Sequence, residues 1–137
     1  MSLLTLQNKI YEINGVKIML DFDLAELYEV ETRVLNQAIK RNIDSFPEDF
    51  MFRLTKEEWE LMTSSQIVMM SSQSVMTSKR PKIALPYAFT EHGVTMLASI
   101  LKSQKARKMN IAIVRAFVAL RKTLLNIENL QNQIELL

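Results

Sequence analysis

Residues 21–41 read DFDLAELYEVETRVLNQAIKR. The first half of this stretch has apolar side chains at helical spacing, namely Leu24, Leu27 and Tyr28. We expect Asp21 or Asp23 to cap this helix, because a carboxylate can accept hydrogen bonds from the free backbone N–H groups of a first turn. The helix should end near Glu29, and a second helix should begin at Thr32. The pattern therefore predicts two helices joined by a tight turn.

The second helix exposes a polar face that is suited to DNA. Its apolar face is formed by Leu35, Ala38 and Ile39. The candidate DNA-binding residues point in other directions, and they are Arg33, Asn36, Gln37, Lys40 and Arg41. Arginine can bridge guanine, glutamine or asparagine can bridge adenine, and lysine can neutralise phosphate. In a helix-turn-helix the second helix lies in the major groove, so double-stranded DNA is the predicted partner. An ordinary amphipathic helix with a solvated outer face is the alternative interpretation.

The flanking sequence predicts short strands and further helices around this pair. Residues 11–20 alternate in polarity on either side of Asn14-Gly15, which is typical of a β-hairpin with a two-residue turn. Further strands are predicted at residues 50–54 and 83–87, and further helices at 56–62, at 91–102 after a Thr90 cap, and from Ser103 onward. The predicted fold class is α+β: a small helix-rich domain with a helix-turn-helix-like pair, short β-hairpins and a long C-terminal helix.

Charge is distributed unevenly along the chain, although the net charge is only +2. Residues 1–78 carry seven Lys/Arg against twelve Asp/Glu, residues 79–122 carry ten against one, and residues 123–137 carry none against two. The three segment charges are therefore −5, +9 and −2, and the +9 segment indicates an anionic partner such as nucleic acid. Lys79, Arg80 and Lys82 follow a Met/Ser-rich near-repeat within residues 62–76. We interpret this region as a basic hairpin arm that contacts the DNA backbone or minor groove, with a solvated loop as the alternative.

The composition excludes most catalytic and metal chemistry. The chain has no cysteine and a single histidine, His92, so it can form neither thiolate nor imidazole clusters. Its two glycines, Gly15 and Gly93, cannot form a phosphate-binding glycine loop. The acidic residues near the start of the first helix are Asp21, Asp23 and Glu26, and a favourable interaction with the helix dipole explains them better than a metal site. We therefore expect no enzymatic activity, no catalytic residue, no cofactor and no bound metal.

The sequence contains no recognisable targeting or membrane-spanning segment. The N-terminus lacks the basic-then-apolar order of a secretory signal, and Arg115 interrupts the best apolar stretch, at residues 110–120. We expect a cytoplasmic protein with no membrane partner.

The last helix carries an apolar seam with mostly three- and four-residue spacings. The seam comprises Met109, Ile113, Phe117, Leu120, Leu124, Ile127 and Ile134. Such spacing is typical of a coiled coil, so a homodimer formed through this helix is predicted. We divide the chain into a DNA-binding domain at residues 1–122 and the start of a coiled-coil or linker helix at residues 123–137, which we expect to continue beyond this sequence.

Several motifs in order along the chain are similar to those of the ORF-six-N domain family, a relative of the KilA-N and Bro-N domains of phages and large DNA viruses. The motifs are VKIMLD at 16–21, DLAELY at 23–28, LNQA at 35–38, KRN at 40–42, FPEDF at 46–50, LTKEEW at 54–59 and LPYAFTEHGV at 85–94. The resemblance implies a non-enzymatic α+β domain in prophage or mobile-element proteins that regulate transcription by binding DNA. A protein-interaction module, such as an antirepressor that binds another regulator, is the alternative function.

Overall fold

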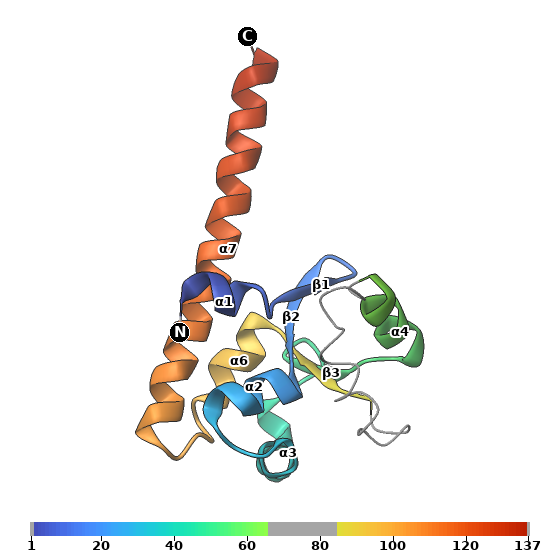
Figure 1. Ribbon diagram of the computed structural model, residues 1–137, viewed down its shortest axis with the longest axis vertical. Coiled ribbons are helices and arrows are strands. Elements are labelled where there is room, and N and C mark those ends of the chain that lie inside the picture. The colour runs from blue at the N-terminus through green and yellow to red at the C-terminus, as the bar shows by residue number, and fades with distance from the viewer. Residues whose placement is uncertain (1, 66–84, 137) are drawn as a thin grey trace.

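The computed structural model describes residues 2–65 and 85–136, which form an α+β domain from which a long C-terminal helix extends (Figure 1). The helices are α1 (Leu3–Gln7), α2 (Asp21–Tyr28), α3 (Thr32–Arg41), the short 3-10 helix η1 (Ile43–Ser45), α4 (Lys56–Ser65), α6 (Glu91–Leu97) and α7 (Gln104–Leu136). The strands are β1 (Tyr11–Ile13), β2 (Val16–Leu20), β3 (Met51–Arg53) and β4 (Tyr87–Phe89). The predicted fold class is confirmed, including the helix pair and the long last helix.

The four strands form one antiparallel sheet in the order β1-β2-β4-β3. The predicted hairpin is confirmed: Asn14 and Gly15 both have positive φ, at 52° and 79°, which matches the twist of a two-residue turn. The strand predicted at 83–87 was misplaced, because β4 begins only at Tyr87. Pro86 has no N–H to donate to a ladder, and its carbonyl accepts a hydrogen bond from Leu54 N at 3.0 Å. Residues 83 and 84 lie outside the described part of the chain.

Helix α4 begins with the predicted capping box. Thr55 N donates to Glu58 Oε1 at 2.9 Å, and Glu58 N donates to Thr55 Oγ1 at 3.1 Å. Trp59 of α4 packs edge-on against Phe22 with ring centroids 6.1 Å apart. This contact fixes α4 beside the start of α2.

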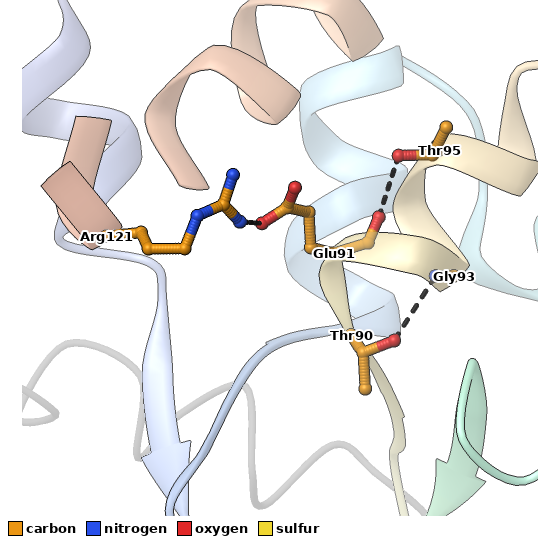
Figure 2. Close-up of polar contacts among 5 residues, drawn as sticks. All are labelled: Thr90, Glu91, Gly93, Thr95 and Arg121. Atoms are coloured by element: carbon orange, nitrogen blue, oxygen red, sulfur yellow. Dashed lines mark hydrogen bonds and ion pairs between the residues drawn. The ribbon is translucent and has the colours of Figure 1, made fainter. Parts of the chain in front are cut away.

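Helix α6 is held at its first turn by close backbone contacts. Thr90 Oγ1 accepts from Gly93 N at 3.3 Å, as predicted for a cap (Figure 2). The same hydroxyl donates to Asp49 O at 2.9 Å. A Cβ atom on Gly93 would lie 2.0 Å from Phe50 O, so only glycine fits there. Figure 2 also shows Glu91 paired with Arg121, which ties α6 to α7.

The turn between α6 and α7 differs from the prediction. Helix α6 ends at Leu97 and not near Lys102, because the following amides form shorter i→i−3 bonds such as Ile100 N to Leu97 O at 3.0 Å. Arg107 Nε then donates to Leu101 O, and Ser103 Oγ accepts from Ala106 N at 3.0 Å. The predicted Ser103 cap is therefore confirmed.

Helix α7 has two parts with different surroundings. In its first part Ile113 and Phe117 are buried in the core, and the buried Asn110 donates to Tyr28 Oη at 2.8 Å and to Val94 O at 2.9 Å. Helix α1, which the sequence analysis did not predict, packs against this part. In the second part, which extends beyond the body in Figure 1, Ile127 and Ile134 are exposed by 47% and 69%. Among the seam residues whose side chains the structure describes, Ile113 and Phe117 therefore belong to the domain's own core, and Ile127 and Ile134 near the end of the helix are exposed. None of the described helices has the length and apolar character needed to cross a membrane.

Candidate nucleic-acid interface

Helices α2 and α3 are arranged as the sequence predicted, and α2 packs against both α3 and α7. The inner faces of the two helices consist of buried core residues, namely Leu24, Ala25, Leu27, Tyr28, Leu35 and Ile39. The expected side-chain cap of α2 is wrong, since Leu20 occupies the N-cap position and makes no side-chain cap bond. Asp21 and Asp23 lie inside the first turn of α2 and are buried. The inner half of the pair is therefore a fixed part of the core.

The turn between the two helices depends on Glu29. This residue ends α2 with a left-handed backbone, at φ 59° and ψ 44°, a conformation that usually favours glycine. Val30 N donates to Ala25 O at 3.0 Å, and Glu29 N donates to Glu26 O at 3.1 Å, so the free carbonyls at the end of α2 are satisfied. The Glu29 carboxylate also pairs with Lys105 of α7 at 2.5 Å. The turn is thereby connected to α2 by backbone hydrogen bonds and to α7 by the ion pair.

The outer face of α3 carries four of the five DNA-binding residues predicted on this helix. Those with exposed side chains are Arg33, Gln37, Lys40 and Arg41. Val34 shares this part of the surface and is 44% exposed. Val34 is not among the residues predicted from the sequence, although its place one residue after Arg33 and three before Gln37 on a helix could have indicated it. An exposed valine in the major groove can contact the methyl group of thymine.

Asn36 is placed differently from the other four residues. It is half-buried, and its Nδ2 donates to Asp21 Oδ2 at 3.1 Å. Asp21 is only 1% exposed, and its Oδ1 accepts from Phe22 N at 2.7 Å. The structure therefore gives Asn36 a contact that fixes α3 against α2.

Three acidic side chains of the α2–α3 region have cationic partners. Glu29 pairs with Lys105, and Glu31 Oε2 lies 3.4 Å from Arg33 Nη2. The buried Asp23 lies 3.8 Å from Lys9 Nζ. Asp23 also acts on Tyr11, whose phenol pKa is raised to about 12, first by burial and second by this negative charge. Negative charge on this side of the domain is partly neutralised by these pairs.

The single histidine, His92, and the neighbouring Glu91 both contact other side chains of the domain. His92 stacks on the Phe50 ring with centroids 5.5 Å apart, and Glu91 is engaged by Arg121. Within residues 2–65 and 85–136, no three acidic or histidine side chains are grouped closely enough to hold a metal ion. The predicted basic arm, with Lys79, Arg80 and Lys82, lies outside the described residues, so its role stays a prediction.

Comparison with known proteins gives one match. The family model described as the ORF6N domain matches residues 8–100, which is more than half of the 137-residue chain. This range contains β1, β2, the α2–α3 pair and the other strands, and it ends just before α7. No curated protein and no solved structure gives a significant match.

Proposed function

Since the chain belongs to the ORF6N domain family, we propose that it is the non-catalytic DNA-binding module of a phage- or mobile-element-type transcription regulator. Helix α3 is the element that enters the major groove, and α2 braces it from behind. Arg33 and Gln37 face base edges, while Lys40 and Arg41 neutralise phosphates near the end of the helix.

The observation that supports this proposal is the contrast between the two faces of α3. Leu35 and Ile39 are buried, and Asn36 is bonded to a buried carboxylate, so the helix cannot rotate freely about its axis. Apart from Val34, the side chains left on the outer face are polar and mainly cationic. A rigid helix that presents such side chains suits a groove lined by phosphates and base edges.

The acidic first part of the chain is the main argument for a protein partner instead. Residues 1–78 carry a charge of −5, and unpaired carboxylates beside α3 would repel phosphate. The ion pairs of Glu29 with Lys105 and of Glu31 with Arg33 reduce this repulsion. These contacts favour DNA over the protein-interaction alternative.

Two copies of the domain dimerise through the outer part of α7. Ile127, Leu130 and Ile134 are exposed there at spacings of three and four residues, as in a coiled-coil seam. A dimer brings two copies of α3 onto neighbouring half-sites, which raises affinity and fixes their spacing. Sedimentation velocity of the wild type and of Ile127→Asp with Ile134→Asp tests this: the wild type should sediment as a dimer and the variant as a monomer. A wild type that is monomeric at every concentration contradicts the dimer.

The DNA-binding proposal is tested by the salt dependence of binding. The anisotropy of a fluorescent random-sequence duplex is measured at about 50 and about 200 mM salt, a range over which several phosphate contacts change affinity by orders of magnitude. We expect binding at the lower salt that weakens steeply at the higher one. A folded protein that binds no duplex at either salt would exclude DNA binding and favour the antirepressor-like alternative.

A further inference from the structure

Glu31 lies immediately before the first residue of α3, and its side chain does not cap the helix. It is the N-cap residue, yet its side chain accepts no hydrogen bond from the first turn of α3. The carboxylate is instead 74% exposed, and its contact is the Nη2 atom of Arg33 at 3.4 Å. In a helix-turn-helix, the residues at the start of the second helix are those that reach base edges. A negative charge therefore occupies a position at which DNA would be contacted.

The chemistry of the major groove restricts what this carboxylate can accept. Guanine presents two acceptors, N7 and O6, and thymine presents O4 and a methyl group, so a carboxylate is repelled or unpaired at both. Adenine has an N6 donor, but the N7 acceptor lies next to it. On its own major-groove edge cytosine presents the N4 amine as a donor and no acceptor, and this amine is the group from which Glu and Asp accept.

We propose, on the basis of the function proposed above, that Glu31 is a specificity-determining residue that reads cytosine through its N4 amine. Arg33 positions the carboxylate, and the remaining N–H donors of its guanidinium stay available for the DNA. The same carboxylate weakens binding to other sequences, because at every site that lacks the matching amine it faces base acceptors and phosphates without a hydrogen-bond donor from the DNA. Glu31 thus lowers the affinity for most duplex sequences and raises the selectivity for sites that contain the cytosine.

The test is a selection from a randomised duplex library by three versions of the full chain. They are the wild type, Glu31→Gln, and Glu12→Gln as the matched control. Glu12 is an exposed glutamate paired with Lys17 at 2.9 Å on the β1–β2 hairpin, so the control removes the same charge from an exposed ion pair on another element. Enriched sequences and the affinity of each version for an unselected duplex are then compared.

We expect the wild type to select a site with one cytosine preferred by roughly tenfold over the other bases. In Glu31→Gln that preference should move to adenine, because a glutamine amide both accepts from N6 and donates to N7. Affinity for unselected duplex should rise in this variant and stay unchanged in Glu12→Gln. Identical base preferences in the wild type and Glu31→Gln would overturn the role of Glu31 while leaving DNA binding intact. Failure of the folded wild type to enrich any duplex would overturn the DNA-binding function and this inference together.

Discussion

The contact between Asn36 and Asp21 gives the sharpest test of how α3 is held. Asn36→Ala removes a hydrogen bond to a carboxylate that is 1% exposed, and hydrogen bonds to charged groups contribute about 1.5–3 kcal/mol. The Asn36 Oδ1 atom is buried and accepts no bond from any described residue, so its removal offsets part of the loss. We therefore expect the free energy of unfolding to fall by about 1.5 kcal/mol, at the lower end of that range.

The neighbouring residue provides the matched control. Gln37 is exposed on the same helix, so Gln37→Ala should change the free energy of unfolding by less than about 0.5 kcal/mol. Urea unfolding followed by circular dichroism measures the free energy of unfolding of both variants. In a thermal scan, the melting temperature of Asn36→Ala should fall by roughly 5 °C. Duplex affinity, measured well below the melting temperature, should fall in Gln37→Ala. Equal stability of the two variants would refute a structural role for Asn36 and return it to the base-contacting residues.

Three further predictions concern the backbone and the high-pH behaviour of the domain. Gly93→Ala should lower the free energy of unfolding by about 3 kcal/mol or more, because the new Cβ would lie 2.0 Å from Phe50 O; a melting curve like that of the wild type would contradict the close approach. Glu29→Gly should be more stable to urea than Glu29→Ala by about 1 kcal/mol, since both lose the Lys105 pair but only glycine adopts φ 59° without strain; the reverse order would show that the turn is not left-handed. The Tyr11 phenol has a folded-state pKa raised to about 12 from 10.0, so the unfolded state releases its proton first, and stability should fall as the pH rises from 10 to 12. Urea unfolding across this range should show a smaller fall in Tyr11→Phe, and an equal fall in both proteins would exclude Tyr11 as a source.

Much of the fold follows from local sequence signals. The spacing of Leu35 and Ile39 indicates the buried face of α3, Asn14-Gly15 indicates the hairpin turn, and Thr55 with Glu58 indicates the start of α4. Each of these signals acts over a few residues, so the physical cause is present in the sequence segment itself.

The features that the sequence analysis missed depend on packing between distant segments. Asp21 was expected at the N-cap of α2, but it lies inside the first turn and is buried, and besides accepting from Phe22 N it accepts from Asn36 of α3. Glu29 has a charge partner, Lys105, that is far away in the chain and becomes a neighbour only when α7 packs on α2. The periodicity of a single helix does not indicate which residues of other elements will contact it. Asn36 was therefore grouped with the exposed residues of α3.

Binding of duplex DNA by α3 is tested by a comparison of two double variants. Arg33→Ala with Lys40→Ala removes two exposed cations from α3, and Arg53→Ala with Lys56→Ala removes the same two charges from exposed positions on β3 and α4. Duplex affinity is measured by anisotropy at about 50 mM salt, where each lost phosphate contact has a large effect. The account predicts that the α3 variant loses about tenfold or more in affinity and the control loses at most about twofold. Equal affinity of the α3 variant and the wild type would contradict the assignment of α3 as the DNA-binding helix.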